Sequence, residues 1–211
     1  LLGTHCNWES YPFVPHRNRP LRPRQSVCPI TGLPAIYKDP RTGIPYATAH
    51  AYAVITKVIQ LYETTVVRHG LTPLGRIVDS QWAGLAPEQM GLGPVHAATP
   101  ILQRHGLGLD DLDLWEINEA FAAQVIACLR AWQDEAYCRD ELGLDGALGA
   151  LDVARLNVDG GAVALGHPVG ASGARIVLHL LHGLRRTGGR RGIAAICIGG
   201  GQGGAMLVEA L

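Results

Sequence analysis

The feature that most constrains the fold is an alternation of short apolar runs with helical patterns, which extends from Val66 to the end of the chain. Such alternation predicts a layered α/β domain in which helices cover a sheet. Because only a glycine-rich turn separates the last two runs, they should be antiparallel, and the sheet should be mixed. Apolar runs of strand length occupy residues 74–83, 112–117, 156–158, 193–198 and 205–211, and helical patterns occupy 95–105, 119–132 and 172–184.

The N-terminal part, residues 1–63, differs because it holds most of the prolines and few long periodic segments. Only residues 47–61 show apolar side chains at helical spacing. The sequence therefore predicts two parts, a small Pro-rich irregular module over 1–63 and the α/β domain over 66–211. Within the second part, residues 136–154 are less regular and read as an insertion.

Charge and cysteine content argue against several classes of function. Lysine plus arginine total 18 and so do aspartate plus glutamate, so no nucleic-acid or membrane partner is expected from charge. The five cysteines form no C-x-x-C pair, which argues against a disulfide framework or a zinc site and favours a reducing, cytoplasmic location. No apolar run reaches the roughly 18 residues of a membrane span. The first residue is leucine, so a mitochondrial or other targeting segment is an open alternative.

The first residue that suggests chemistry is Asn118, which opens residues 118–122 (NEAFA) where an apolar run meets a helical pattern. An amide at such a junction can hold a water or a substrate oxygen at the mouth of the sheet. It can equally cap the following helix, and on residue type alone capping is the stronger interpretation.

The second is His167, which lies inside residues 160–175 (GGAVALGHPVGASGAR), just before a helical pattern. The glycines let backbone and ligand approach closely, and a histidine on so constrained a loop can donate to a developing oxyanion. A lone histidine is more often structural, and here only the glycine context favours a functional role. The segment does not match a phosphate-binding loop, since it lacks the G-x-x-x-x-G-K pattern.

The third is Cys197, at the end of an apolar run and followed by glycines from Gly199 onward. A cysteine there can face a pocket and exchange a proton as thiol or thiolate. A buried, inert cysteine beside a tight hairpin is an equally good interpretation. Together, an asparagine, a histidine and a cysteine at strand ends are typical of acyl transfer.

These segments, with residues 90–94 (MGLGP), closely resemble the C-terminal signatures of the thiolase family, in the expected order. The resemblance implies an acyl-CoA C-acyltransferase that cleaves or condenses coenzyme A thioesters, with these thioesters as substrates and no other cofactor or metal. Asn118 would hold a water that forms an oxyanion hole with His167, and His167 would help to activate a nucleophilic cysteine. Cys197 would be the acid/base at the substrate's alpha carbon.

For the remaining site residues, the resemblance implies that the amide of Gly199 contributes to a second oxyanion hole. It also implies that Phe121 and Met90 contact substrate. The nucleophilic cysteine of thiolases lies on an N-terminal domain that no part of this sequence matches, so the chain should be inactive alone. The expected partners are therefore an acyl-CoA, a thiolase N-terminal domain or a second copy of the chain. A pseudo-thiolase that serves only in oligomerisation is a further alternative.

A second resemblance covers about residues 26–55, which are similar to the small C-terminal domain of YL nuclear proteins. It implies an interaction module of chromatin-remodelling complexes, without catalytic residues. This gives the alternative function, an interaction subunit in the nucleus. A natural fusion, a fragment and a mis-joined gene would all produce this combination.

Overall fold

The computed structural model describes residues 35, 37–38, 45–62, 65–66 and 68–211. Contacts divide the chain into two units, of which one holds Leu74–Leu211 and the other holds the described residues up to Pro73. Most of residues 26–55, on which the second resemblance rests, lie outside the described range.

The described residues of the smaller unit include a two-stranded ribbon and the helix α1. Strand β1 (Tyr37–Lys38) pairs antiparallel with β2 (Pro45–Tyr46), and α1 (Ala49–Tyr62) follows. The helix predicted over 47–61 is therefore confirmed. Thr48 Oγ1 accepts a hydrogen bond from Ala51 N at 3.1 Å, which satisfies one of the free amide groups at the start of the helix.

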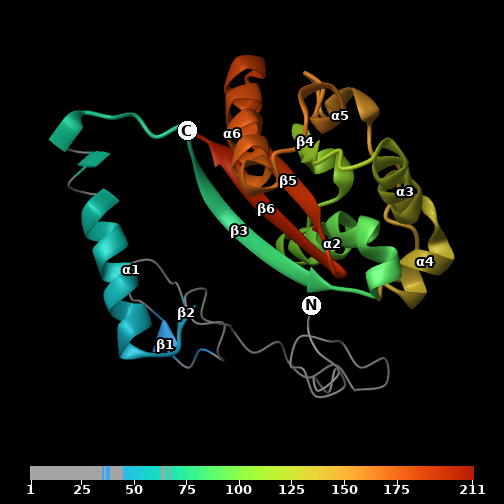
Figure 1. Cartoon of the computed structure of the whole chain (residues 1–211), viewed down its shortest axis with the longest axis horizontal. Helices are drawn as coiled ribbons and strands as arrows, with labels where there is room; N and C mark the ends of the chain where they lie inside the picture. The colour runs from blue at the N-terminus through green and yellow to red at the C-terminus, as the bar shows by residue number, and fades with distance from the viewer. Residues whose placement is uncertain (1–34, 36, 39–44, 63–64, 67) are drawn as a thin grey trace. The chain divides into compact units, whose positions relative to one another are not determined.

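The larger unit is built on a four-stranded mixed sheet with the order β3-β6-β5-β4 (Figure 1). Strand β3 pairs antiparallel with β6, β6 pairs antiparallel with β5, and β5 pairs parallel with β4. The prediction of a mixed sheet whose last two strands form a hairpin is confirmed. The strands are β3 (Gly75–Gly84), β4 (Leu114–Ile117), β5 (Arg191–Ile198) and β6 (Gln202–Ala210).

Helices cover both faces of this sheet, as the α/β alternation predicted. On one face α2 (Gly93–His105) and α3 (Ala122–Gln133) pack on Trp115, Ile193 and Leu207. On the other face α6 (Val169–Thr187) buries Ile176, Leu180 and Leu184 against β4, β5 and β6. The remaining elements are η3 (Pro87–Leu92), η4 (Leu109–Asp111), α4 (Glu135–Asp140), η5 (Val153–Arg155) and α5 (Ala162–Leu165).

Two sequence predictions were wrong in detail. Residues 156–158 form no strand, because only Leu156 makes a parallel bridge, to Trp115, before Asn157 turns into the left-handed region at φ 47°. The helix predicted from residue 119 begins only at Ala122, and residues 118–121 form a loop. The irregular segment 136–154 overlaps α4 and the start of η5.

None of the described helices is long and apolar enough to cross a membrane. Likewise, the part of the chain that the structure describes contains no cluster of three histidine, cysteine, aspartate or glutamate side chains able to hold a metal ion.

The start of α2 lies so close to the start of β6 that glycine is required on both elements. A Cβ added at Gly203 would overlap the carbonyl group of Gly93, and one added at Gly93 would lie 2.5 Å from the carbonyl oxygen of Gln202. Both obstacles are backbone atoms, which cannot move without shifting a helix against the sheet. The glycines after Cys197 therefore also serve packing.

We expect Gly203→Ala to lower the free energy of unfolding by about 2 kcal/mol, since the added methyl forces α2 away from β6. Urea denaturation followed by circular dichroism measures this change. Gly146→Ala is the matched control, because a Cβ at Gly146 meets no atom within 4 Å. Equal stability of the two variants would contradict the close approach.

Candidate active site

The candidate site lies at the edge of the sheet where β4 and β5 both end. These strands are parallel, so their carboxyl ends meet at the same edge, with Ile117 opposite Ala195. The pairing continues one residue beyond β4, because Asn118 N donates to Ala195 O at 2.9 Å. Asn118 is thereby fixed beside Ala195, which lies two residues before Cys197 on the neighbouring strand β5.

Asn118 is buried, with 1% of its surface exposed, and its side chain does not cap a helix. Helix α3 begins four residues later, at Ala122, its N-cap position is Phe121, and no side-chain hydrogen bond caps it. The capping interpretation is therefore wrong. Instead Asn118 Nδ2 lies 3.4 Å from His167 Nε2, while Oδ1 has no hydrogen-bond partner among the described residues.

His167 lies on the short connection between α5 and α6. Gly166 before it has φ 91°, a conformation that side-chain-bearing residues rarely adopt, and Pro168 after it is the N-cap position of α6. The ring is held at both nitrogens, since Nε2 faces Asn118 and Nδ1 lies 2.6 Å from Ser172 Oγ. This histidine is therefore oriented from two sides at the sheet edge.

An asparagine side chain attaches the glycine-rich loop to the free edge of β4. Asn157 Oδ1 accepts from Ile117 N, and its Nδ2 donates to Ile117 O, both at 2.9 Å, so the amide pairs with β4 as a neighbouring strand would. The same Nδ2 donates to Glu119 Oε1 at 3.0 Å. This clasp joins the residue before Asn118 to the loop that carries His167.

Glu119 completes the attachment. Its Oε2 accepts from Val163 N at 3.1 Å, and a Cβ added at Gly161 would lie 2.5 Å from its carboxyl carbon. A side chain at Gly161 would therefore displace the Glu119 carboxylate from its bonds to Asn157 and Val163.

Cys197 is the penultimate residue of β5 and is buried, with 6% of its surface exposed. Burial raises the pKa of its thiol, because a thiolate is poorly solvated there. Gly199 is exposed in the turn to β6, where Gly200 and Gly201 have φ of 84° and 82°. Among the described residues, Cys197 makes no hydrogen bond to Asn118 or His167.

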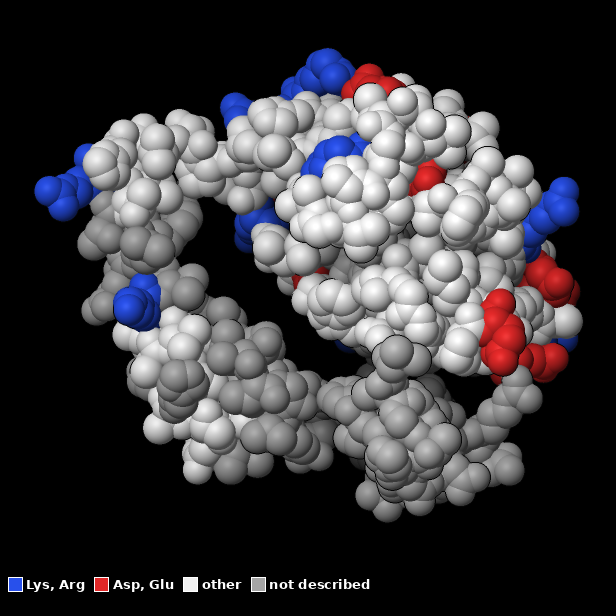
Figure 2. Space-filling view, in the orientation of Figure 1, with Lys and Arg blue, Asp and Glu red and all other residues white. Residues whose placement is uncertain are grey.

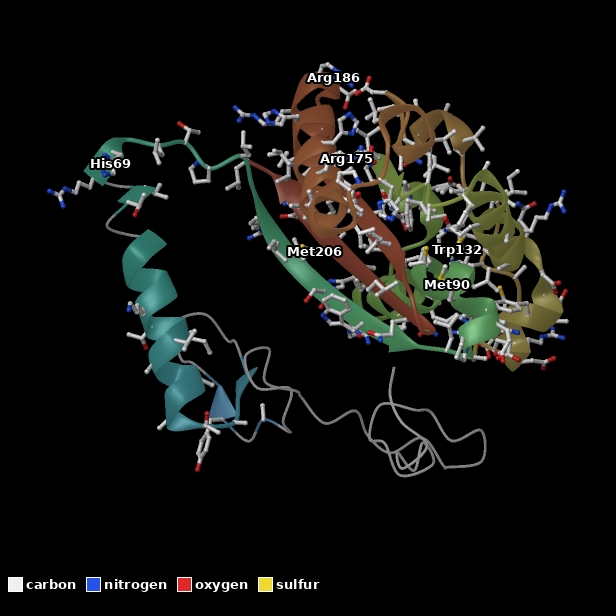
Figure 3. All side chains as sticks on the ribbon, viewed as in Figure 1. His69, Met90, Trp132, Arg175, Arg186 and Met206 are labelled. Carbon is white, nitrogen blue, oxygen red and sulfur yellow. The ribbon has the colours of Figure 1, made fainter. Side chains whose placement is uncertain are left out.

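The two predicted substrate contacts lie on the α3 side of the unit. Phe121 is 64% exposed in the loop before α3, and Met90 is half-buried in η3 (Figure 3). Helix η3 is close to α3, because a Cβ on Gly91 would contact the Gln124 side chain at 3.1 Å. In the described part of the chain, neither Phe121 nor Met90 contacts His167.

A charged network ties α6 to β4 beside the site. Glu116 is buried, and burial raises its pKa, although the His179 imidazole bonded to it acts in the opposite direction. His179 Nδ1 lies 2.7 Å from Glu116 Oε1, and its Nε2 lies 2.9 Å from Asp159 Oδ2, which Arg186 also contacts. Arg175, on the same helix, has Nε and Nη2 buried without a hydrogen-bond partner in the described part (Figure 3).

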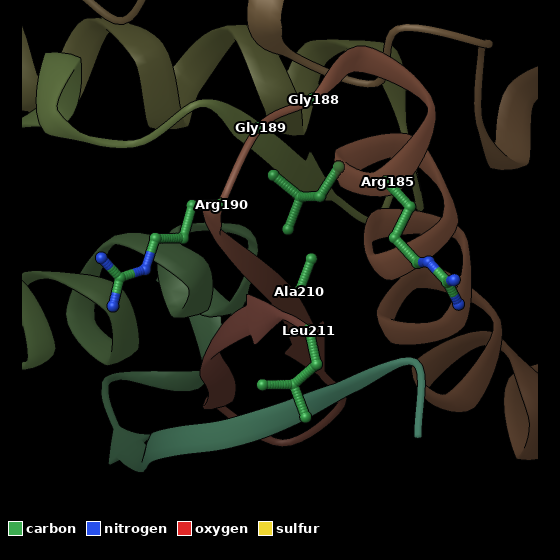
Figure 4. A pocket seen from close by; sticks show the side chains of 7 residues that line it. Arg185, Gly188, Gly189, Arg190, Ala210 and Leu211 are labelled. Atoms are coloured by element: carbon green, nitrogen blue, oxygen red, sulfur yellow. The ribbon is translucent and has the colours of Figure 1, made fainter. Parts of the chain in front are cut away.

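Two surface hollows lie apart from these residues. One, of about 260 Å³, is bounded by Arg185, Arg190 and Leu211 at the edge where β5 begins, which is the opposite edge from Cys197 (Figure 4). The other, of about 550 Å³, runs along α3 past Ile126 and Tyr137. Neither is lined by His167 or Cys197.

The structure therefore brings Asn118 and His167 into direct contact and places Cys197 on the adjacent strand. Sequence reasoning missed the roles of Asn157, Glu119 and Ser172, although all three lie in or beside the motifs. An asparagine three residues before the double glycine Gly160-Gly161 was the available signal for Asn157, since asparagine tolerates the left-handed region. Nothing local indicated that Ser172 would reach His167.

Family comparisons agree with this geometry. Residues 71–210 match the family model described as thiolase, C-terminal domain. Residues 27–55 match the YL1 nuclear protein C-terminal domain. Both resemblances predicted from the motifs are confirmed.

Similar proteins carry thiolase and acetyltransferase names. Human mitochondrial 3-ketoacyl-CoA thiolase is 40% identical over 188 residues, which cover 89% of this chain and 43% of the human protein. Mouse cytosolic acetyl-CoA acetyltransferase is 47% identical over 152 residues, covering 72% of this chain and 34% of the relative. The crystal structure of the human mitochondrial thiolase in complex with CoA superposes with a TM-score of 0.58 at 46% identity, over 71% of this chain and 34% of that one. The chain thus spans less than half of these relatives.

Because burial raises the Cys197 pKa, we expect this thiol to stay protonated at neutral pH and to react slowly with iodoacetamide. Alkylation should accelerate only as the pH rises above the ordinary range of a thiol. Peptide mapping after timed alkylation measures the rate at Cys197. Cys128, whose pKa burial raises to about 12, provides an internal reference that should react more slowly still. Fast alkylation of Cys197 at neutral pH would contradict the prediction.

Proposed function

Because the chain belongs to the thiolase family, we propose that Leu74–Leu211 supplies one half of the active site of an acyl-CoA C-acyltransferase. The observation that carries this proposal is the buried contact of Asn118 with His167, at the sheet edge where Cys197 also lies. The other half, with the nucleophilic cysteine, would come from a thiolase N-terminal domain. The substrate would be an acyl-CoA thioester, which needs no further cofactor.

In this proposal Asn118 and His167 stabilise charge on the thioester oxygen. The Asn118 Oδ1 atom has no partner among the described residues, so it can accept a hydrogen bond from a water that faces the oxygen. His167 acts beside it and also receives the proton of the nucleophilic thiol. The backbone amide of Gly199 would serve the second oxyanion hole, and Phe121 and Met90 would contact the acyl-CoA.

Cys197 would exchange the proton of the alpha carbon. In cleavage, the departing carbon takes a proton from a thiol, so the residue has to be protonated beforehand. Burial raises the Cys197 pKa and keeps it in that form at neutral pH. In condensation the same sulfur, as thiolate, would take the proton.

One strand of the sheet has an exposed apolar face on which a second domain could dock. Helix α6 covers β4, β5 and β6 (Figure 1), whereas it reaches β3 at the start of that strand, where a Cβ on Gly75 would overlap the Leu181 side chain. On this side of the sheet Ile77 is 62% and Trp82 is 69% exposed, and each lies opposite a residue of the α6 face of β6. We call Ile77, Ser80 and Trp82 the β3 face. Charged side chains are sparse over the larger unit in Figure 2 and lie mostly toward its rim.

We propose that the N-terminal thiolase domain covers the β3 face, since the relatives contain more than the part that this chain spans. The relatives named above give no support to chromatin-remodelling subunits as partners. They include both mitochondrial and cytosolic proteins, so the cytoplasmic location stays a prediction.

The chain should cleave acetoacetyl-CoA only after a separately produced thiolase N-terminal domain is added, because covalent catalysis needs the nucleophile. In the complemented enzyme, His167→Ala and Cys197→Ala should each reduce the rate at least about 100-fold, as expected on losing an acid/base or oxyanion group. Thiolysis followed by loss of acetoacetyl-CoA absorbance measures this. His182→Ala, at an exposed histidine of α6, and Cys138→Ala, at a buried cysteine of α4, are the matched controls. Full activity in either site variant would refute its assigned role.

The isolated chain should self-associate through the β3 face, and Trp82→Ser with Ile77→Ser should shift it toward monomer by removing apolar surface. Sedimentation velocity measures the distribution. Val153→Ser is the control, because Val153 is equally exposed but lies on η5. A native chain that sediments as a single monomer would count against this surface.

A further inference from the structure

Ser172 contacts the far side of the His167 ring and is not among the residues assigned to the reaction above. It lies in the first turn of α6 with none of its surface exposed. Its Oγ is 2.6 Å from His167 Nδ1 and also 3.1 Å from Pro168 O. The buried hydroxyl is therefore within hydrogen-bonding distance of both atoms.

A serine hydroxyl has one proton to donate, and a carbonyl oxygen can only accept. Ser172 donates that proton to Pro168 O, which also accepts from the backbone amides of Ala171 and Ser172. The hydroxyl oxygen then has only lone pairs left for the histidine. In this arrangement Nδ1 is the nitrogen that carries a proton, and it donates to Ser172 Oγ across 2.6 Å.

The other side of the ring requires the same tautomer. Asn118 directs its amide nitrogen, a donor, at His167 Nε2 across 3.4 Å. Only an unprotonated Nε2 can accept there. The opposite tautomer would require the Asn118 amide to turn over and the Ser172 proton to leave Pro168.

We propose that Ser172 is a positioning residue, which holds neutral His167 as the Nδ1–H tautomer and so keeps Nε2, on the Asn118 side of the ring, unprotonated and able to take up a proton. Such partners fix the tautomer of functional histidines generally. The consequence of this His167 tautomer for catalysis rests on the proposed function. The thiol S–H bond of the nucleophile breaks, an Nε2–H bond forms, and the thiolate attacks. The imidazolium then presents its new Nε2–H to the thioester oxygen.

The tautomer can be observed in the full chain without catalysis. Nitrogen-15 NMR of the histidine-labelled chain, at mildly alkaline pH, distinguishes protonated from unprotonated ring nitrogens, and His167→Gln assigns the signals. We expect the proton on Nδ1. Ser172→Ala should lower the ratio of Nδ1–H to Nε2–H about five-fold, which matches the net strength of one hydrogen bond. Ser172→Thr, which keeps the hydroxyl, should restore it.

A native chain that carries the proton on Nε2 would overturn the proposal, whether or not the variants fold. An unchanged ratio in folded Ser172→Ala would also overturn it. In the complemented enzyme, Ser172→Ala should lower the rate of thiolysis, with Ser172→Thr restoring it; full activity in Ser172→Ala would remove the positioning role while the proposed function stands. If no form is active on complementation but the tautomer is as expected, the proposed function fails and the role of Ser172 in fixing the ring remains.

Discussion

The parallel pairing of β4 with β5 is the constraint on which the rest of the site depends. Since the two strands run in the same direction, Asn118 and Cys197 leave the sheet at one edge, and the Asn118 amide is bonded to Ala195 on the neighbouring strand. The sheet packs between α6 on one face and α2 with α3 on the other, so this edge cannot shift without disturbing both cores.

The loop that carries His167 is held to this edge by polar side chains instead of a further strand. Asn157 pairs with both backbone groups of Ile117, and Glu119 binds the loop at Val163. These bonds replace the ladder that β4 lacks on its outer side and satisfy backbone groups that would otherwise be unpaired. Hydrogen bonds of side-chain amides and carboxylates are directional, so these bonds hold the loop in one position. In that position His167 contacts Asn118.

The candidate site consists mainly of polar groups instead of formally charged ones. Burial favours the neutral thiol of Cys197, and His167 is hydrogen-bonded to the neutral side chains of Asn118 and Ser172. The titratable side chains Glu116 and His179 are bonded to one another on the α6 side. In the proposed function, a thioester oxygen that develops charge would meet oriented dipoles, which stabilise it without reorganisation.

The sequence by itself determined the alternation of strands and helices, the final hairpin and the motifs around Asn118, His167 and Cys197, because periodicity and glycine placement are local properties. It misjudged residues 156–158, where the Asn157 side chain, and not a strand, occupies the edge of β4. Only the tertiary structure decided that Asn118 binds His167 instead of capping α3, and that Ser172 holds the opposite ring nitrogen. These contacts join residues from different elements, and their partners depend on how the strands and the loop pack, which residue type and spacing do not specify.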